Sequence, residues 1–147
     1  MSLHLFIVFS MLFTAPMPLE SDLKSGSVLV TISNLRSQTG KVNVSLFNAA
    51  KGFPSNPEKA VAIQRVSISS NQVTLRFDNI PFGTYAVACH HDENGNGKMD
   101  TNLLGIPKEG YGASNNAVGK FSAPKFSEAK FPFDGAVLSV NIKMFYW

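Results

Sequence analysis

The sequence predicts an all-β fold, a single antiparallel β-sandwich of about seven strands. Apolar and polar residues alternate over several short runs, which is the period-two pattern of half-buried strands. Clusters rich in Gly, Pro, Asn and Asp separate these runs and predict turns. The runs are not accompanied by a convincing amphipathic helix. Short strands joined by turns are typical of a sandwich, and a closed barrel is the structural alternative.

The first two strands are expected near the start of the domain. Valine and isoleucine alternate with polar residues over residues 27–34, and the pattern recurs over residues 42–46. The Ser-Gln-Thr-Gly segment at residues 37–40 is typical of a turn. We therefore expect these two strands to pair as a hairpin.

Three more strands follow. The third is expected over residues 60–69, where the alternation slips at Gln64 and Arg65 and indicates a β-bulge. Apolar residues occupy every second position of residues 73–78 and should face the core. Residues 84–89 are apolar on both faces, which predicts a central strand.

The C-terminal part begins with a short pseudo-repeat. Lysine–phenylalanine pairs recur every five residues, at Phe121, Phe126 and Phe131. This period fits neither a helix nor a strand, so we expect these phenylalanines to anchor a long segment that crosses the sheet edge. Residues 131–133 and 136–144 then predict a final hairpin around an Asp-Gly type I′ turn, with the proline of its first strand at an edge.

An N-terminal targeting segment is expected before the domain. Residues 3–13 form an apolar run far shorter than the ~20 residues that span a bilayer. We interpret residues 1–21 as a signal peptide and residues 22–147 as the β-sandwich domain. The protein should then be periplasmic or secreted, with no stable membrane span. A buried N-terminal strand is the alternative for the apolar run.

Composition excludes several classes. A chain of 147 residues has room for one core. The net charge of +3 comes from dispersed lysines, whereas nucleic-acid binding needs a concentrated basic face. Nucleic acid is therefore not an expected partner. Cys89 is the only cysteine, which excludes an intramolecular disulfide and predicts a small buried side chain.

The segment after the central strand is interpreted as a calcium-binding loop. Oxygen-bearing side chains recur every second residue around Gly97. A hard cation such as Ca²⁺ prefers several converging oxygens, and the segment matches the first half of a D-x-[DN]-x-[DN]-G loop. The predicted ligands are Asp92, Asn94, Asn96, the backbone carbonyl of Lys98, and Asp100.

This loop departs from an EF-hand at position 12, where Leu103 replaces the bidentate glutamate. We therefore expect weak binding, with a Kd on the order of 10⁻⁴ to 10⁻³ M, assisted by Asn102, Glu109 or water. The alternative is a metal-free loop. Type I′ turns at the two Asn-Gly pairs, or Asx-turns, would explain the same residues.

A second candidate site follows the loop. An aromatic ring in a glycine-rich segment, surrounded by polar groups, suits carbohydrate or cell-surface recognition. The predicted ligand-binding residues are Glu109, Tyr111, Ser114, Asn115 and Asn116. Alternatively, Tyr111 packs onto the core and the asparagines cap turns.

Catalysis is not expected. The domain has two histidines, His90 and His91, and neighbours on a strand point to opposite faces. They cannot readily share a metal or form a base with its orienting group. No nucleophile, phosphate-binding or zinc motif is present. The expected function is an exported non-enzymatic module that binds an unknown protein or carbohydrate ligand outside the cytoplasm, or serves structurally.

A longer motif supports this expectation. Residues 91–116 contain H-D-x-N-x-N-G-x-x-D followed by G-x-P-x-E-G-Y-G-x-S-N-N. With this motif, residues 26–144 resemble a bacterial family of small exported proteins whose domain has no assigned function. The resemblance implies a prealbumin-like or immunoglobulin-like sandwich outside the cytoplasm and implies no activity. Ala113 stands where an aromatic residue is often found in that family.

Transthyretin-type domains share this kind of fold, and some are hydroxyisourate hydrolases. Those enzymes need separated histidines, an arginine and a C-terminal Tyr-Arg-Gly-Ser motif. The chain instead ends in Phe145-Tyr146-Trp147. A hydrolase of transthyretin-related type is therefore the least favoured expectation.

Overall fold

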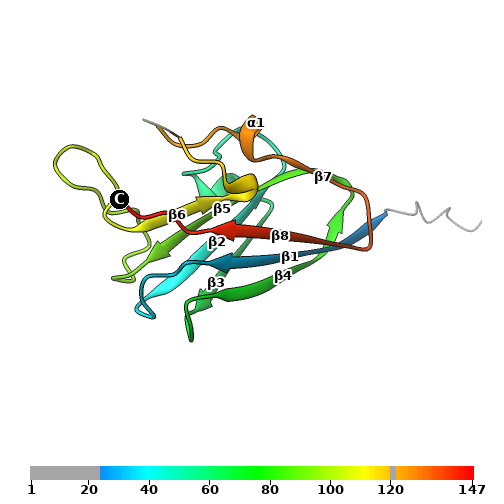
Figure 1. Cartoon of the computed structure of the whole chain (residues 1–147). Coiled ribbons are helices and arrows are strands. Elements are labelled where there is room, and N and C mark those ends of the chain that lie inside the picture. The colour runs from blue at the N-terminus through cyan, green and yellow to red at the C-terminus, as the bar shows by residue number, and fades with distance from the viewer. Residues whose placement is uncertain (1–23, 120–121) are drawn as a thin grey trace, which may run out of the picture.

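The computed structural model describes residues 24–119 and 122–147. Two β-sheets pack face to face, so the predicted all-β sandwich is confirmed (Figure 1). The predicted signal peptide, residues 1–21, lies outside the described residues. Within the described ranges, no helix is long and apolar enough to cross a membrane.

The smaller sheet has three strands in the order β4-β1-β8. They are β1 (Ser25–Ser33), β4 (Val73–Pro81) and β8 (Val137–Lys143). The central strand β1 is antiparallel to β4 and parallel to β8. Parallel neighbours need a long connection, and here the chain builds the whole second sheet between β1 and β8 (Figure 1).

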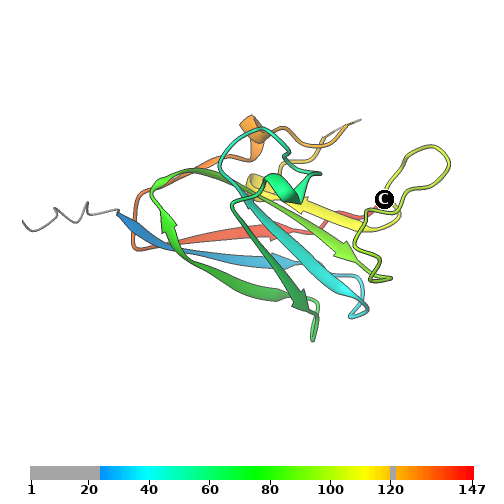
Figure 2. The ribbon, with the colours of Figure 1, turned by 180° about the vertical axis from the view of Figure 1, so that it is seen from behind.

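The larger sheet has the order β3-β2-β5-β6, and β7 pairs with the start of β5 (Figure 2). Its strands are β2 (Lys41–Phe47), β3 (Ala62–Ser67), β5 (Gly83–Asp92), β6 (Gly110–Ala113) and β7 (Phe131–Phe133). In the part of the chain that the structure describes, the connections contain three helical turns, η1 (Pro57–Lys59), η2 (Ser114–Asn116) and α1 (Phe126–Ala129). Tyr111 of β6 bridges to Phe145 after β8, so the two sheets meet along one edge.

The core lies between the sheets and follows the predicted alternation. Val28, Val30 and Ile32 of β1 are fully buried against the larger sheet. The inward positions predicted for residues 73–78 are buried too. Burying each such side chain stabilises the fold by roughly 1.5–3 kcal/mol relative to leaving it in water.

Both predicted hairpins are wrong. β1 and β2 lie in different sheets, and so do β7 and β8. In the connection after β1, Leu35 is buried in the core, and its N–H donates to the carbonyl of Asn71 just before β4. The connection before β8 reaches the smaller sheet because the Ser27 N–H donates to the carbonyl of Ala136. Turn residues show where the chain bends, whereas these contacts with distant residues decide which sheet it joins.

The predicted bulge at Gln64–Arg65 is also wrong. β3 pairs with β2 in unbroken register from Ser67 to Ala62. Gln64 occupies an inward position, and its side-chain amide donates to the carbonyl of Arg76 on β4 at 2.6 Å. Ile63 is exposed instead. The alternation of apolar and polar residues is interrupted here because Gln64, whose amide is hydrogen-bonded, faces inward and the apolar Ile63 faces outward.

The central position of β5 is confirmed, since β2 and β6 flank it on either side. Cys89 on this strand is buried, as expected, and is packed in the main core. Phe131 also lies in the core, and Phe126 packs edge-on against Phe53. These two phenylalanines anchor the crossing segment as predicted, while Phe121 lies outside the described residues.

The thiol of Cys89 is expected to be unreactive in the folded protein. Burial raises the pKa of the Cys89 thiol to about 12, and the thiolate is the reactive form. The thiolate fraction at pH 8 should therefore fall roughly 10³-fold below that of an unfolded chain. Labelling by a disulfide reagent at pH 8, with and without denaturant, measures this ratio. Equal rates in both conditions would show that the strand exposes its thiol.

Candidate metal centre

The candidate site lies where β5 ends and the long loop begins. His90 and Asp92 share one face of β5, and His91 points to the other face. His91 is fully buried, and its ring nitrogens lie 2.7 Å from the Tyr146 hydroxyl and 2.8 Å from the carbonyl of Thr39. A carbonyl can only accept, so Nε2 of His91 carries a proton. The predicted separation of the two histidines is confirmed.

Asp92 is a buried carboxylate with 2% of its surface exposed. Its Oδ2 accepts from the Gly97 N–H at 2.9 Å and from the Asn43 side-chain amide at 3.4 Å. Burial is the largest effect and raises the pKa of Asp92, but these hydrogen bonds, together with the Gly95 backbone and the neighbouring His90, outweigh it and bring the pKa below its ordinary value. The carboxyl group is therefore ionised at neutral pH.

The second oxygen of Asp92 lacks a hydrogen-bond donor. Among the described residues, two buried side-chain oxygens accept no hydrogen bond, Asp92 Oδ1 and Asn43 Oδ1. Asn43 is the β2 residue directly opposite His90, so it lies on the same face as Asp92. A buried charged oxygen without a donor is unfavourable unless a cation or a water molecule binds it.

The loop itself is closed by its own side chains. The Asn94 Oδ1 accepts from the Asn96 N–H at 3.1 Å, and the Asn96 Oδ1 accepts from the Lys98 N–H at 2.8 Å. These are Asx-turns, and the side-chain amides of both asparagines also donate to the carboxylate of Asp100. The glycines have positive φ and the asparagines do not, which excludes type I′ turns at the two Asn-Gly pairs.

Glu109 joins the two ends of this loop. It is 4% exposed and stands just before β6. Its Oε1 accepts from the Glu93 N–H at 2.9 Å, while its Oε2 accepts from the Asp100 N–H at 3.2 Å and lies 2.9 Å from the His90 Nε2. The sequence suggested two roles for Glu109, a loop ligand and a sugar contact, and the structure places it at the loop.

Three potential ligand atoms converge at this point. One atom each from His90, Asp92 and Glu109 lies within 4.8 Å of the others. Of the three, Glu109 also lines a hollow of about 400 Å³, which is bordered by Glu93, Asp100 and other loop residues. Asp100 is not a member of the converging trio, because its carboxylate is turned to the two asparagine amides. The predicted ligands therefore lie in one loop, and Asp92 is the only one of them within the trio.

Sequence reasoning missed His90 and Asn43 as site residues. The sequence indicates at most a supporting hydrogen bond from one of the two histidines to the loop, and it places Asn43 on the outward face of its strand. Both reach the site through the antiparallel register of β2 and β5, in which Asn43 faces His90. The signal that could have found them is the period of two along β5, which places His90 on the same face as Asp92.

Charge at the rim of the hollow is partly balanced. Arg36 forms an ion pair with Glu93, and its guanidinium also donates to the carbonyl of Lys108 at 2.8 Å. The hydrogen bond from Arg36 is the main reason that the pKa of Glu93 lies below its ordinary value. Glu93 is therefore already paired, which leaves the carboxylates of Asp92, Asp100 and Glu109 as the negative charge of the site.

The residues of the second candidate site are held within the fold. The Ser114 hydroxyl is fully buried, accepts from the Val87 N–H at 2.9 Å and donates to the carbonyl of Ala129 at 2.6 Å. Asn115 donates to the carbonyls of Glu128 and Lys130, and the Asn116 Oδ1 accepts from the Lys143 N–H. Tyr111 is half-buried, and its ring is tilted against the ring of Phe145 with 5.4 Å between the two ring centroids. Glu109 is at the loop, apart from these contacts.

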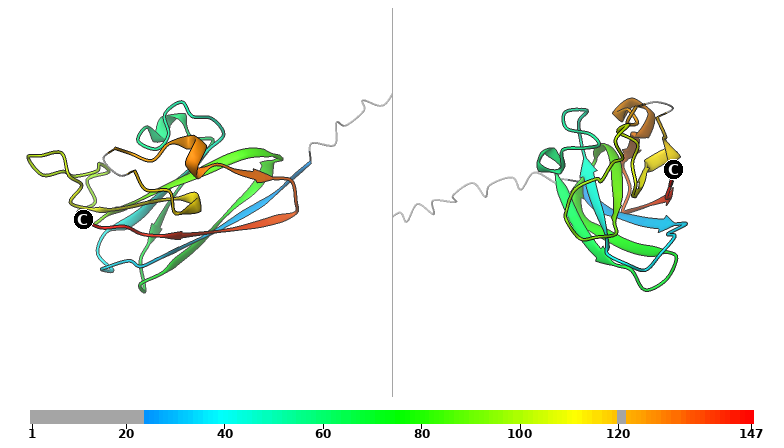
Figure 3. Two further views of the ribbon diagram at one scale, coloured as in Figure 1. Left: turned by 45° about the horizontal axis from the view of Figure 1, so that its top comes forward. Right: turned by 90° about the vertical axis from the view of Figure 1, so that its left-hand side faces the viewer.

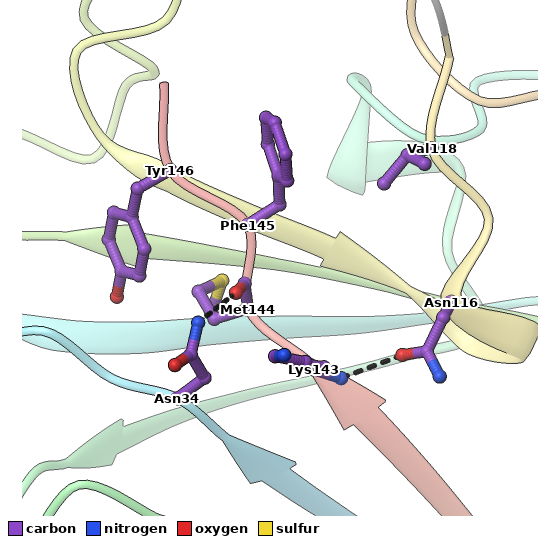
Figure 4. Close-up of a pocket in the computed structure, with 7 residues that line it drawn as sticks. All are labelled: Asn34, Asn116, Val118, Lys143, Met144, Phe145 and Tyr146. Carbon is purple, nitrogen blue, oxygen red and sulfur yellow. Dashed lines mark hydrogen bonds between the residues drawn. The ribbon is translucent and has the colours of Figure 1, made fainter.

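A surface groove of about 430 Å³ lies beside the C-terminal segment (Figure 4). Its lining residues are Asn34, Asn116, Val118, Lys143, Met144, Phe145 and Tyr146. The Asn34 amide donates to the carbonyl of Met144 at 2.8 Å, and Asn116 bonds the backbone of Lys143 (Figure 4). Its two amide side chains therefore stabilise the backbone rather than converge on a ligand.

Comparison with known proteins gives one family. Residues 30–141 match the family described as "Uncharacterized protein conserved in bacteria (DUF2141)". No curated protein and no solved structure is significantly similar to the chain.

Proposed function

The chain belongs to this family of uncharacterized proteins conserved in bacteria, and on that premise we propose that it is an exported, non-enzymatic binding module whose β5–β6 loop is stabilised by Ca²⁺. The buried Asp92 Oδ1, which accepts no hydrogen bond among the described residues, carries this proposal. The prealbumin-like or immunoglobulin-like character of the sandwich and its place in the periplasm or outside the cell belong to the same proposal.

The donor set suits a hard cation. Asp92 would supply the ionised oxygen that the fold leaves without a donor, and Glu109, whose carboxylate converges with it, would supply another. Asp100 lies across the adjoining hollow, which Glu109 also lines, and would supply a third carboxylate. Glu109 stands in for the carboxylate that position 12 lacks, where the chain has Leu103. Asn94, Asn96 and the carbonyl of Lys98 would complete the shell from the loop.

Weak binding is expected for a structural reason. The carboxylate of Glu109 already accepts three N–H groups out of roughly four lone-pair positions. The amides of Asn94 and Asn96 face Asp100 and would have to turn to present oxygen. Both effects compete with the cation, so a Kd on the order of 10⁻⁴ to 10⁻³ M remains our expectation.

The absence of an enzymatic role is also proposed from contacts. His91 has both ring nitrogens engaged, and His90 is bound to Glu109. Cys89, the one cysteine, is buried in the core. A general base or nucleophile needs a free and accessible reactive atom. The buried His91 and Cys89 do not offer one, and the Nε2 of His90 is engaged by Glu109.

Calcium is expected to raise the thermal stability of the protein. At a concentration of 100 times the Kd, binding to the native state alone adds about 2.7 kcal/mol. For a domain of this size the Tm should rise on the order of 5–10 °C. The Asp92→Asn variant keeps the shape of the side chain but removes its charge, so its Tm should not respond. Calorimetric titration with Ca²⁺ and thermal melts with and without chelator measure both effects.

Asp134→Asn is the matched control, because Asp134 is an exposed residue of the β7–β8 connection. It should respond to Ca²⁺ as the unaltered protein does. A response to Zn²⁺ at micromolar concentrations, with none to Ca²⁺, would assign the site to the imidazole of His90 and overturn the calcium proposal. Equal responses of the Asp92→Asn and Asp134→Asn variants would also contradict it.

A further inference from the structure

The tip of the long loop presents two adjacent leucines to solvent. Leu103 and Leu104 have relative exposures of 106% and 84%, the highest among the exposed large apolar side chains in the described part of the chain. They lie at the end of a small hairpin, residues 101–107, which we call the finger. The yellow-green loop that contains the finger stands clear of both sheets (Figures 1 and 3).

The finger is built as a fixed hairpin. Thr101 and Pro107 pair at its base. At its tip, the Asn102 Oδ1 accepts from the N–H groups of Leu104 at 2.9 Å and Ile106 at 3.0 Å. The Asn102 N–H donates to the carbonyl of Ile106, and the Gly105 N–H donates to that of Asn102. Asn102, considered above as a metal ligand, therefore holds the leucines outward instead.

The base of the finger is attached to the domain. The Lys108 N–H donates to the carbonyl of Asp100 at 2.8 Å, and the Asp100 N–H donates to Glu109. Because the backbone is already ordered, binding through the leucines does not require the finger to lose much conformational entropy. A tip of this kind is prepared for contact with an apolar phase.

The shape and charge of the finger favour a lipid surface. Neither leucine is covered by the domain, so the tip exposes apolar surface that an apolar phase can cover. Residues 102–105 form a turn, closed by the Gly105 N–H on the carbonyl of Asn102, so both leucines lie at the outermost point of the finger. Interfacial anchors enter a bilayer by about 5–10 Å. Lys98 and Lys108 flank the finger, and both are exposed. The carboxylates of Asp92 and Glu109 at its base are buried, and that of Asp100 is hydrogen-bonded to two side-chain amides, so the lysines dominate the exposed charge beside the finger.

We propose that the finger inserts Leu103 and Leu104 into the interfacial region of an anionic lipid bilayer. This inference goes beyond the proposed function and does not depend on the cation site. The leucines supply the apolar contact, and the two lysines supply attraction to the phosphates. The domain would then lie on the membrane with its loop end towards the lipid.

The test places a fluorophore on the finger. Leu104→Trp is made in the full chain together with Trp147→Phe, which removes the native tryptophan. Vesicles of phosphatidylglycerol and phosphatidylcholine should shift its emission to the blue, and brominated lipids should quench it. Val137→Trp in the same background is the control, since Val137 is also exposed but begins β8 at the opposite end of the sandwich (Figure 1). This readout reports the finger itself, whatever other segment of the chain meets the vesicle.

A second variant measures the contribution of the leucines. Leu103→Ser with Leu104→Ser should lower the vesicle partition coefficient on the order of 100-fold. Val61→Ser with Ile63→Ser removes two exposed apolar side chains elsewhere and should leave it unchanged. The proposal is overturned if the tryptophan on the finger shows no shift, as expected if its partner is a protein pocket. It is equally overturned if both tryptophans shift alike, if neutral vesicles bind as well as anionic ones, or if the serine variant binds fully.

Discussion

Replacing Glu109 with alanine is expected to lower the free energy of unfolding on the order of 3 kcal/mol. The substitution removes a buried carboxylate that accepts N–H groups from Glu93, Asp100 and His90. Each buried donor left without an acceptor costs about 1–3 kcal/mol, and water can reach only part of the space created. Loss of the ionised side chain offsets part of this cost, because its own desolvation is also removed.

Urea unfolding measures the effect on the whole domain, and hydrogen exchange locates it. The amide protons of Glu93 and Asp100 should exchange faster in Glu109→Ala, because both donate to this carboxylate. Glu58→Ala is the control, since Glu58 is exposed and its side chain makes no hydrogen bond recorded in the described structure. A loss below about 1 kcal/mol for Glu109→Ala would show that the loop does not need this connection.

The conservative variant separates charge from geometry. Glu109→Gln keeps the volume but offers one acceptor oxygen in place of two, and its NH₂ group would face at least one N–H donor. We expect Glu109→Gln to lower the free energy of unfolding, but by less than Glu109→Ala does. An equal or larger loss for glutamine would indicate that repulsion between donors dominates.

The strand faces could be predicted from the sequence because they depend on local alternation. Val28 and Phe77 face the core wherever their strands pair, since a period of two fixes the face regardless of the neighbour. The pairing itself could not be predicted. The parallel alignment of β1 with β8 joins residues more than 100 positions apart, and an Asp-Gly pair before β8 has the same local signature as a hairpin turn.

The candidate site shows the same division. The loop from Asp92 to Asp100 could be identified because its residues are neighbours in the chain. Glu109 reaches the loop from the start of β6, and Asn43 reaches it from β2, so neither contact is visible as a spacing. Ser114 illustrates the opposite error, because a polar residue in a loop can serve the backbone rather than a ligand.

Gly40→Ala is expected to lower the free energy of unfolding and also to disturb the loop that follows Asp92. Gly40 has φ of 72°, and a Cβ on it would lie 1.9 Å from the carbonyl oxygen of Asp92. The left-handed backbone alone costs a residue with Cβ roughly 1–2 kcal/mol. Moving the neighbouring backbone adds about 1–3 kcal/mol, so the total loss should be about 2–5 kcal/mol.

Two other glycines separate these contributions. Gly105 has a similar φ of 76° with nothing within 4 Å, so Gly105→Ala should show only the conformational cost. Gly135 has open space and no positive φ, so Gly135→Ala should be nearly neutral. Urea unfolding of the three variants should therefore give losses in the order Gly40, Gly105, Gly135. Because the clash falls on the backbone of Asp92, Gly40→Ala should also weaken the response to Ca²⁺, whereas Gly135→Ala should not. Equal decreases in the free energy of unfolding for Gly40→Ala and Gly105→Ala would show that the backbone before β2 can shift at little cost. The turn would then not fix the position of Asp92.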